Sequence, residues 1–297
     1  MASQSLSQTV QKRLPTEAYH FKSRHLLTYL CLIIGAFFAI LPFLWMISTS
    51  LMTLGETINR QVIPANPQWQ NYVISWNEAK FSTYFLNSVV ITAVTLTGLL
   101  ITSVLAAYAF ACISFPGRNL IFSLLLATLM IPETVTIIPQ LLMIRGQVFP
   151  LPFGPSWMNS LQGLSVPFMA SAFSIFLLRQ FFATIPNDLW DAARIDGAGH
   201  LRFLIQIVLP MSRPVLMTVT LLGFIASWNA FLWPLLVTTT AKWRPLMVGL
   251  WTFITEAGAE THLLMAGAVI TIVPVLIVFF LAQKHFTEGI ATSGLKG

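Results

Sequence analysis

The most polar part of this apolar chain is the stretch 188–210, in which charged side chains stand among alanines and glycines. Its first half reads Asp-Leu-Trp-Asp-Ala-Ala-Arg-Ile-Asp-Gly-Ala-Gly, and apolar segments flank the stretch on both sides. Small side chains let another surface approach closely, and charges at the rim supply polar contacts. The apolar segments carry no His or Asp cluster and no nucleophile–base pair, so the chemistry we expect here is docking and not catalysis.

Two short helices are predicted to present this surface. Asn187 is expected to cap the first helix, and Asp188 suits the positive end of its dipole. Gly197 and Gly199 are expected to end it, because glycine tolerates the left-handed conformation that helix ends often need. A second helix over about 200–209 would carry one apolar face, formed by Leu201, Leu204, Ile205 and Val208. An elbow that only returns the chain to the membrane, with no partner, is the alternative.

The composition indicates what must position this surface. The chain has 297 residues, of which 56% are hydrophobic and only 9% are charged. Soluble domains carry about a quarter charged residues, so the composition excludes a soluble protein and indicates a membrane protein that crosses the bilayer several times. The net charge of +6 therefore indicates cytoplasmic loops and not nucleic-acid binding. Cys31 and Cys112 lie far apart in apolar segments, which favours packing over a disulfide or a metal site.

Six segments are apolar and long enough to cross a bilayer, for which a helix needs about 20 residues. The third contains Pro132, Glu133 and Pro139, which predict a kink or a break. The fold class we predict is an all-α membrane protein with six transmembrane helices and one cytoplasmic insertion between the fourth and the fifth. The six segments are 26–49, 85–110, 119–144, 163–181, 214–238 and 263–283.

The distribution of Lys and Arg predicts the orientation. With the amino terminus inside, eleven basic residues fall on the inner side and five on the outer side. Both termini and the 182–213 loop are then cytoplasmic, and residues 1–25 and 284–297 are tails of a permease domain spanning 26–283. The outer loops are 50–81, 145–162 and 239–262; the last is a polar loop with Glu256 and Glu260.

The polar stretch resembles the EAA loop of permease subunits in bacterial ABC importers. That loop reads Glu-Ala-Ala-x-x-Asp-Gly-Ala and, after a gap, Ile-x-Leu-Pro, and the spacing here matches throughout. Only Asp191 departs from it, with a shorter acid in place of Glu. The resemblance implies a coupling helix that sits in a groove of a separate ATPase subunit. The residues it assigns to ATPase coupling are Asp191, Ala192, Ala193, Asp196, Gly197, Ala198, Leu209 and Pro210.

Two more stretches resemble the carbohydrate branch of this family, typified by the smaller permease of the maltose importer. One runs from Trp228 to Leu235, and the other is the tail from Phe286 to Gly297. The resemblance implies four partners: a second, different permease, two ATPase subunits and an extracytoplasmic solute-binding protein. The chain contains no Gly-x-x-x-x-Gly-Lys-Ser/Thr loop, so ATP and Mg²⁺ are expected on the ATPase partners and no cofactor on this chain.

Four residues are candidates for the solute path. Trp228, Asn229 and Trp233 lie in the fifth apolar segment, where aromatic faces and an amide suit a sugar. Helix packing is the alternative for these three. Glu133 is the carboxylate well inside an apolar segment, where a charge is costly and points to a role in the path or a gate. A paired structural charge or a position at the outer rim is the alternative.

Two readings from other classes remain. An ion-gradient-driven secondary transporter usually has two halves with matching broken helices and midplane ionisable residues, and here only Glu133 is available. An integral membrane enzyme would need a catalytic cluster, and the apolar segments of this sequence contain none. The sequence does not identify the solute.

Overall fold

The computed structural model describes residues 23–148, 156–255 and 258–293. The chain forms two compact units, Met1–Met46 and Ile47–Gly297, and each is described by itself. The first unit contains most of helix α1, Ser23–Ser50, a 28-residue apolar helix with Pro42 inside it. Its span candidate, Thr28–Ser50, coincides with the first predicted segment.

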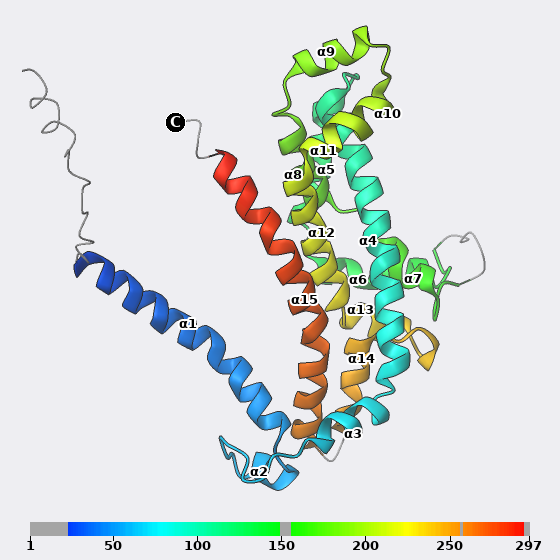
Figure 1. Cartoon of the computed structure of the whole chain (residues 1–297). Coiled ribbons are helices and arrows are strands. Elements are labelled where there is room, and N and C mark those ends of the chain that lie inside the picture. Colours follow the sequence, from blue (N-terminus) through cyan, green and yellow to red (C-terminus); the bar gives the residue numbers. More distant parts are fainter. Residues whose placement is uncertain (1–22, 149–155, 256–257, 294–297) are drawn as a thin grey trace, which may run out of the picture. The chain divides into compact units, whose positions relative to one another are not determined.

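Two helices of the second unit are also long and apolar enough to cross a membrane: α4, Phe81–Cys112, and α15, Thr261–Ser293, in its part Thr261–Gln283. At 1.5 Å per residue, the 32 residues of α4 extend over about 48 Å. These helices confirm the second and sixth predicted segments. The packing of α4 against α8, α12 and α14 makes it the central helix of the unit (Figure 1).

The remaining three spans are bent pairs of helices. Arg118–Met130 and Glu133–Ile144 meet at 102°, Leu161–Phe168 and Ala172–Phe182 at 43°, and His200–Met211 and Arg213–Trp228 at 83°. With each pair counted as one span, the described residues have up to six spans, and the predicted all-α membrane class is confirmed. The first break follows Ile131 and Pro132, as the prolines predicted.

These pairs are built from short elements. They are α5 (Arg118–Ala127), η1 (Thr128–Met130), α6 (Glu133–Ile144), α7 (Leu161–Ser165), η2 (Val166–Phe168), α8 (Ala172–Phe182), α10 (His200–Phe203), η3 (Leu204–Val208), α11 (Leu209–Met211) and α12 (Arg213–Trp228). The element η3 is a π-helical turn. Pro210 has no N–H for the carbonyl of Gln206, so the regular ladder is interrupted there.

The fifth predicted segment, 214–238, is not continuous. Helix α12 ends at Trp228, and the chain resumes as α13, Leu232–Val237. Pro234 cannot donate to the carbonyl of Ala230, which weakens the helical hydrogen-bond ladder where the break occurs. The expected mid-helix position of Asn229 is therefore wrong: Asn229 lies at the break.

The three segments predicted as loops also contain short elements. They hold α2 (Leu54–Ile58), α3 (Gln70–Glu78), the start of α7, η4 (Ala241–Trp243), α14 (Leu246–Leu250), η5 (Trp251–Phe253) and the antiparallel pair β1 (Ile254–Thr255) and β2 (Gly258–Ala259). Thr53 and Glu56 form a capping box at α2, a local signal that was present in the sequence. Backbone hydrogen bonds from Thr53 and Ala65 hold the pKa of Glu56 below its usual value. Glu256, the 1–22 part of the amino-terminal tail and residues 294–297 lie outside the described residues, as do the side chains of the tail from 284 on.

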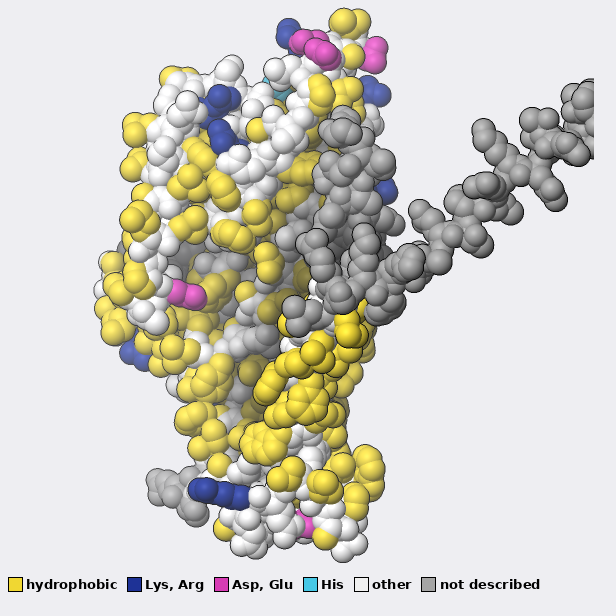
Figure 2. All heavy atoms as spheres, turned by 90° about the vertical axis from the view of Figure 1, so that its left-hand side faces the viewer, with side chains coloured by type: hydrophobic (Ala, Val, Ile, Leu, Met, Phe, Trp, Pro, Cys, Tyr) yellow, Lys and Arg dark blue, Asp and Glu magenta, His cyan; other side chains and the backbone are white. Residues whose placement is uncertain are grey.

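Buried side chains of the second unit form three clusters. The largest joins α4, α5, α8, α12 and the helices that follow Pro186, and the others lie around Trp228 and around Trp233. On the face shown in Figure 2, charged side chains gather at the end where α9 lies, and hydrophobic side chains cover most of the middle. The large cluster therefore anchors the polar stretch to the apolar helices.

Candidate functional site

The polar stretch folds as an elbow, which we define as residues 187–211. Its first helix is α9, Asn187–Ile195, and α10, η3 and α11 form its second arm (Figure 1). Asp188 lies in the first turn of α9, as predicted, but the expected capping role of Asn187 is wrong. Pro186 occupies the cap position, and no side chain caps this helix. The proline fixes the entry angle, since its φ is restricted.

The turn of the elbow is a Schellman motif. Gly197 has φ +76°, its N–H donates to the carbonyl of Arg194 over 3.0 Å, and the N–H of Ala198 donates to the carbonyl of Ala193 over 2.8 Å. Glycine adopts this left-handed conformation without steric cost, which confirms the prediction for Gly197. The prediction for Gly199 is wrong, because Gly199 is extended, with φ −84°, and precedes α10 as its cap residue.

One face of the elbow packs inward. Ala193, Phe203, Leu204 and Val208 are all buried in the large cluster, beside Leu178 of α8. The structure corrects two expectations here. Ala193 is 5% exposed and contacts its own chain, so it does not offer close approach to another surface. The predicted apolar face is also rotated, since Leu201 and Ile205 are exposed.

The other face of the elbow is open. Asp191, Ala192, Asp196 and Gly197 are exposed, and Ile195 between them is 87% exposed. Among the remaining predicted coupling residues, Pro210 is exposed, whereas Ala198 and Leu209 are half-buried against the cluster. Carboxylates that surround apolar side chains at a protruding turn suit a protein partner with a groove.

Three side chains that the sequence analysis missed tie the elbow to α4. The imidazole of His200 stacks on the indole of Trp190, with ring centroids 4.3 Å apart and an angle of 17° between the planes. The Tyr108 hydroxyl and His200 Nδ1 share a hydrogen bond of 2.9 Å. Trp190 and His200 are separated by the whole turn, so no spacing within one helix identifies the pair.

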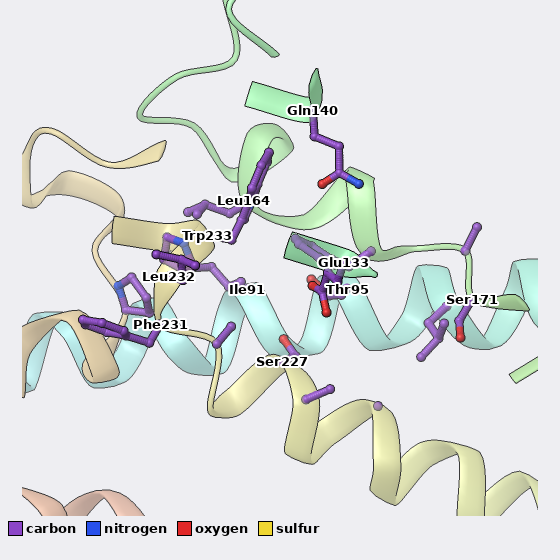
Figure 3. Close-up of a pocket in the computed structure, with 18 of the residues that line it drawn as sticks. Ile91, Thr95, Glu133, Gln140, Leu164, Ser171, Ser227, Phe231, Leu232 and Trp233 are labelled. Atoms are coloured by element: carbon purple, nitrogen blue, oxygen red, sulfur yellow. The ribbon is translucent and has the colours of Figure 1, made fainter. Parts of the chain in front are cut away.

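The second feature is a cavity of about 780 Å³ in the Ile47–Gly297 unit. Its walls come from α4, α6, the α7–α8 pair, α12 and α13 (Figure 3). Apolar side chains make up most of the lining, and the polar lining residues are Ser88, Thr95, Glu133, Thr134, Gln140, Ser171, Ser174 and Ser227. A cavity with an apolar wall and a few polar groups is typical of a small-molecule site.

The four predicted path residues separate into two pairs. Glu133 and Trp233 line the cavity, and Trp233 also donates from Nε1 to the carbonyl of Gly163 over 3.0 Å. Trp228 is buried between Phe85 and Phe224 and donates to the carbonyl of Thr271 over 3.1 Å, which is a packing role. Asn229 is exposed and is not among the lining residues.

A polar stripe on α4 was also missed. Ser88, Thr92, Thr95 and Ser103 are all buried, and they follow one another with Leu99 at intervals of three or four residues. That spacing places them on one face of a helix, so the signal was available in the sequence. Within the described residues, no three His, Cys, Asp or Glu side chains are placed to hold a metal ion.

Comparisons with known proteins agree on one family. Residues 98–292 match the family "Binding-protein-dependent transport system inner membrane component". The chain is 38% identical over 240 residues to the sn-glycerol-3-phosphate transport system permease protein of Yersinia pestis bv. Antiqua (strain Antiqua), covering 78% of this chain and 83% of that protein. It is 35% identical over 270 residues to the arabinooligosaccharides transport system permease protein of Halalkalibacterium halodurans, covering 88% and 93%.

Among solved structures, a chain of a bacterial ABC transporter involved in the import of the acidic polysaccharide alginate is similar in fold. The TM-score is 0.75 and the sequence identity 25%, over 89% of this chain and 96% of that chain.

Proposed function

Because the chain belongs to the binding-protein-dependent transport system inner membrane components, we propose that it is the permease subunit of an ATP-driven importer for a sugar-like solute. In this proposal the chain forms half of the solute path, and the elbow receives the mechanical work of ATP hydrolysis. The observation that carries the proposal is the two-faced elbow. One face is anchored in the large buried cluster, and the other holds Asp191, Ala192 and Asp196 in the open.

The proposal assigns the energy source to partners. Two ATPase subunits bind ATP and Mg²⁺, and this chain hydrolyses nothing. A second, different permease completes the path, and a solute-binding protein delivers the solute from outside. The proposed location is the bacterial cytoplasmic membrane, with both termini, and hence the elbow, on the cytoplasmic side. Eleven basic residues on the proposed inner side against five on the outer side support this orientation.

The solute class rests on the cavity and on the relatives. Hydroxyl groups from α4, α8 and α12 line the cavity together with the indole of Trp233, and such groups can bond hydroxyls and contact the apolar face of a sugar ring. The similar proteins include an arabinooligosaccharide permease and an sn-glycerol-3-phosphate permease. An ion-gradient-driven transporter fits less well, because the family match concerns binding-protein-dependent transport.

The test uses the purified complex of this chain with its ATPase, second permease and binding-protein partners, reconstituted in proteoliposomes. Asp196→Lys reverses an exposed charge at the end of α9, where the helix dipole itself favours a cation. We therefore expect no loss of thermal stability but at least about a tenfold loss of ATP-driven uptake, as for a lost charge contact at an interface.

The control is Lys242→Glu, a reversal of an exposed charge far from the elbow. The carbonyl of Lys242 accepts from Asn87, 21 residues before Tyr108 on α4, which corresponds to about 30 Å along the helix. This variant should support ATP-driven uptake as the unmodified chain does. Uptake without any ATPase subunit, or normal uptake by the Asp196→Lys complex, would refute the proposal.

A further inference from the structure

The cavity contains a single type of charge. Among the described residues that line it, Glu133 is the only one with a charged side chain, and none of them is a Lys, Arg or His. Figure 3 shows the Glu133 side chain projecting into the cavity in the direction of α4 and Thr95. Apolar side chains make up most of the rest of the wall.

The start of α6 fixes the backbone position of Glu133. Glu133 is the first residue of α6, directly after the break at Pro132, and its carbonyl accepts from Thr136 Oγ1 over 2.8 Å. The amino-terminal end of a helix attracts anions through its free N–H groups and its dipole. The chain's own carboxylate therefore occupies the position at which this helix would otherwise favour an anionic solute.

The polar side chains that share the wall with Glu133 are neutral. Ser88 accepts from the N–H of Leu246, Ser171 from that of Ser174, and Ser227 donates to Thr92. Thr95 lines the cavity and is 5% exposed, and its Oγ1 is closed off within the wall. These neutral groups therefore do not offset the charge of Glu133.

We infer that Glu133 is a charge filter in the solute path: it admits uncharged or cationic solutes and disfavours anions such as phosphate esters and uronates. The inference deepens the proposed function and rests on it. Similarity does not decide this point, because the similar proteins are named for the transport of sn-glycerol-3-phosphate, of arabinooligosaccharides and of the acidic polysaccharide alginate. The charge of the wall does decide it for this chain's half of the path.

The test reads the charge of the cavity directly and requires no knowledge of the solute. Cys31 and Cys112 are replaced by Ala, and Thr95→Cys places a single thiol in the wall of the full chain in its complex. Two water-soluble probes of similar size react with this thiol: the trimethylammonium-ethyl and the sulfonato-ethyl methanethiosulfonates. Each rate is divided by the rate of the same probe with free 2-mercaptoethanol.

The inference predicts that the cationic probe reacts about tenfold faster than the anionic one after this normalisation, since one carboxylate attracts one probe and repels the other. Glu133→Gln should bring the ratio close to one. Glu78→Gln, which removes an exposed carboxylate before α4, should leave it unchanged. A ratio near one with Glu133 present, or the same ratio after Glu133→Gln, overturns the inference.

Failure of this inference is distinguishable from failure of the proposed function. If neither probe reaches the thiol, no water-filled path passes Thr95 and the filter is refuted, whereas the Asp196→Lys uptake test still reads ATP coupling. If uptake needs no ATPase subunit, the importer assignment fails whatever the probe ratio is.

Discussion

The elbow and the cavity differ in how the chain builds them. The elbow uses 25 consecutive residues, and its turn is set by hydrogen bonds between neighbours, such as that from the N–H of Ala198 to the carbonyl of Ala193. The cavity takes its wall from segments between Ser88 and Pro245, which meet only when the helices pack. A surface such as the elbow can therefore be encoded locally, whereas a cavity of this kind requires the whole fold.

A glycine is critical in each region, for opposite reasons. Gly197 needs a left-handed backbone, and a Cβ there would meet nothing within 4 Å. Gly163 needs space, because a Cβ on it would lie 2.2 Å from the carbonyl oxygen of Trp157. Substitution of Gly197 should therefore act through the local backbone conformation, whereas substitution of Gly163 should act through packing beside the cavity.

The largest effect is expected for Gly163→Ala, beside the cavity and directly before the lining residue Leu164. The atom that the new methyl group would meet is backbone, which cannot rotate away, so the chain must shift. The same shift displaces the Gly163 carbonyl that accepts from Trp233 Nε1. We expect a loss of about 1–3 kcal/mol in the free energy of unfolding, as for an overpacked core. Thermal unfolding of the purified complex measures it.

The matched control is Gly55→Ala in α2, where a Cβ would meet nothing within 4 Å. This variant should unfold at the temperature of the unmodified chain or slightly above, because alanine favours a helix over glycine. Equal unfolding temperatures for Gly163→Ala and Gly55→Ala would contradict a packing role for Gly163.

A smaller effect on stability is expected in the elbow for Gly197→Val. A β-branched residue in the left-handed region is unfavourable by on the order of 1–2 kcal/mol, so the substitution destabilises the Schellman turn. Because 1.4 kcal/mol corresponds to about a factor of ten, we expect about a tenfold loss of binding-protein-stimulated ATP hydrolysis in the complex.

Gly199→Ser serves as its control. Gly199 is extended, its Cβ position is free, and serine is a favoured residue at a helix cap. Hydrolysis should remain as in the unmodified complex. If both substitutions had the same effect, the turn conformation would not be what matters at residue 197.

The elbow could be predicted from the sequence because its signals lie next to each other. Its sequence contains the Asp-Gly pair, the flanking alanines and the later Leu-Pro within a short stretch. These residues predicted the turn at Gly197 and indicated the family. The orientation of the two short helices was predicted wrongly, because Ala193 is buried and Leu201 is exposed. The rotation of a short helix about its axis depends on what it packs against, and the cluster partners Tyr108 and Leu178 come from α4 and α8.

The cavity was only partly predictable. Pro132 and Glu133 predicted a broken helix with a charge at the break, since proline interrupts helices and a carboxylate within an apolar segment is costly. Trp228 and Trp233 could not be distinguished from the sequence, as both are tryptophans in one apolar segment. The break at Asn229 separates them, so that Trp228 packs against Phe224 while Trp233 reaches the wall.

The smallest effect is expected for Tyr108→Phe, which tests whether the two regions are connected. Tyr108 lies on the helix whose residues Ile91 and Thr95 line the cavity, and its hydroxyl bonds His200 of the elbow. Removing that bond costs about 1 kcal/mol and leaves the Trp190–His200 stack in place. If α4 carries the movement of the elbow to the cavity, the complex should hydrolyse more ATP for each solute molecule it transports. The control is Tyr84→Phe, a buried tyrosine near the other end of α4, which should leave this ratio unchanged. An unchanged ratio for Tyr108→Phe as well would mean that the elbow acts on the cavity by another route, such as α12, which follows the elbow directly in the chain.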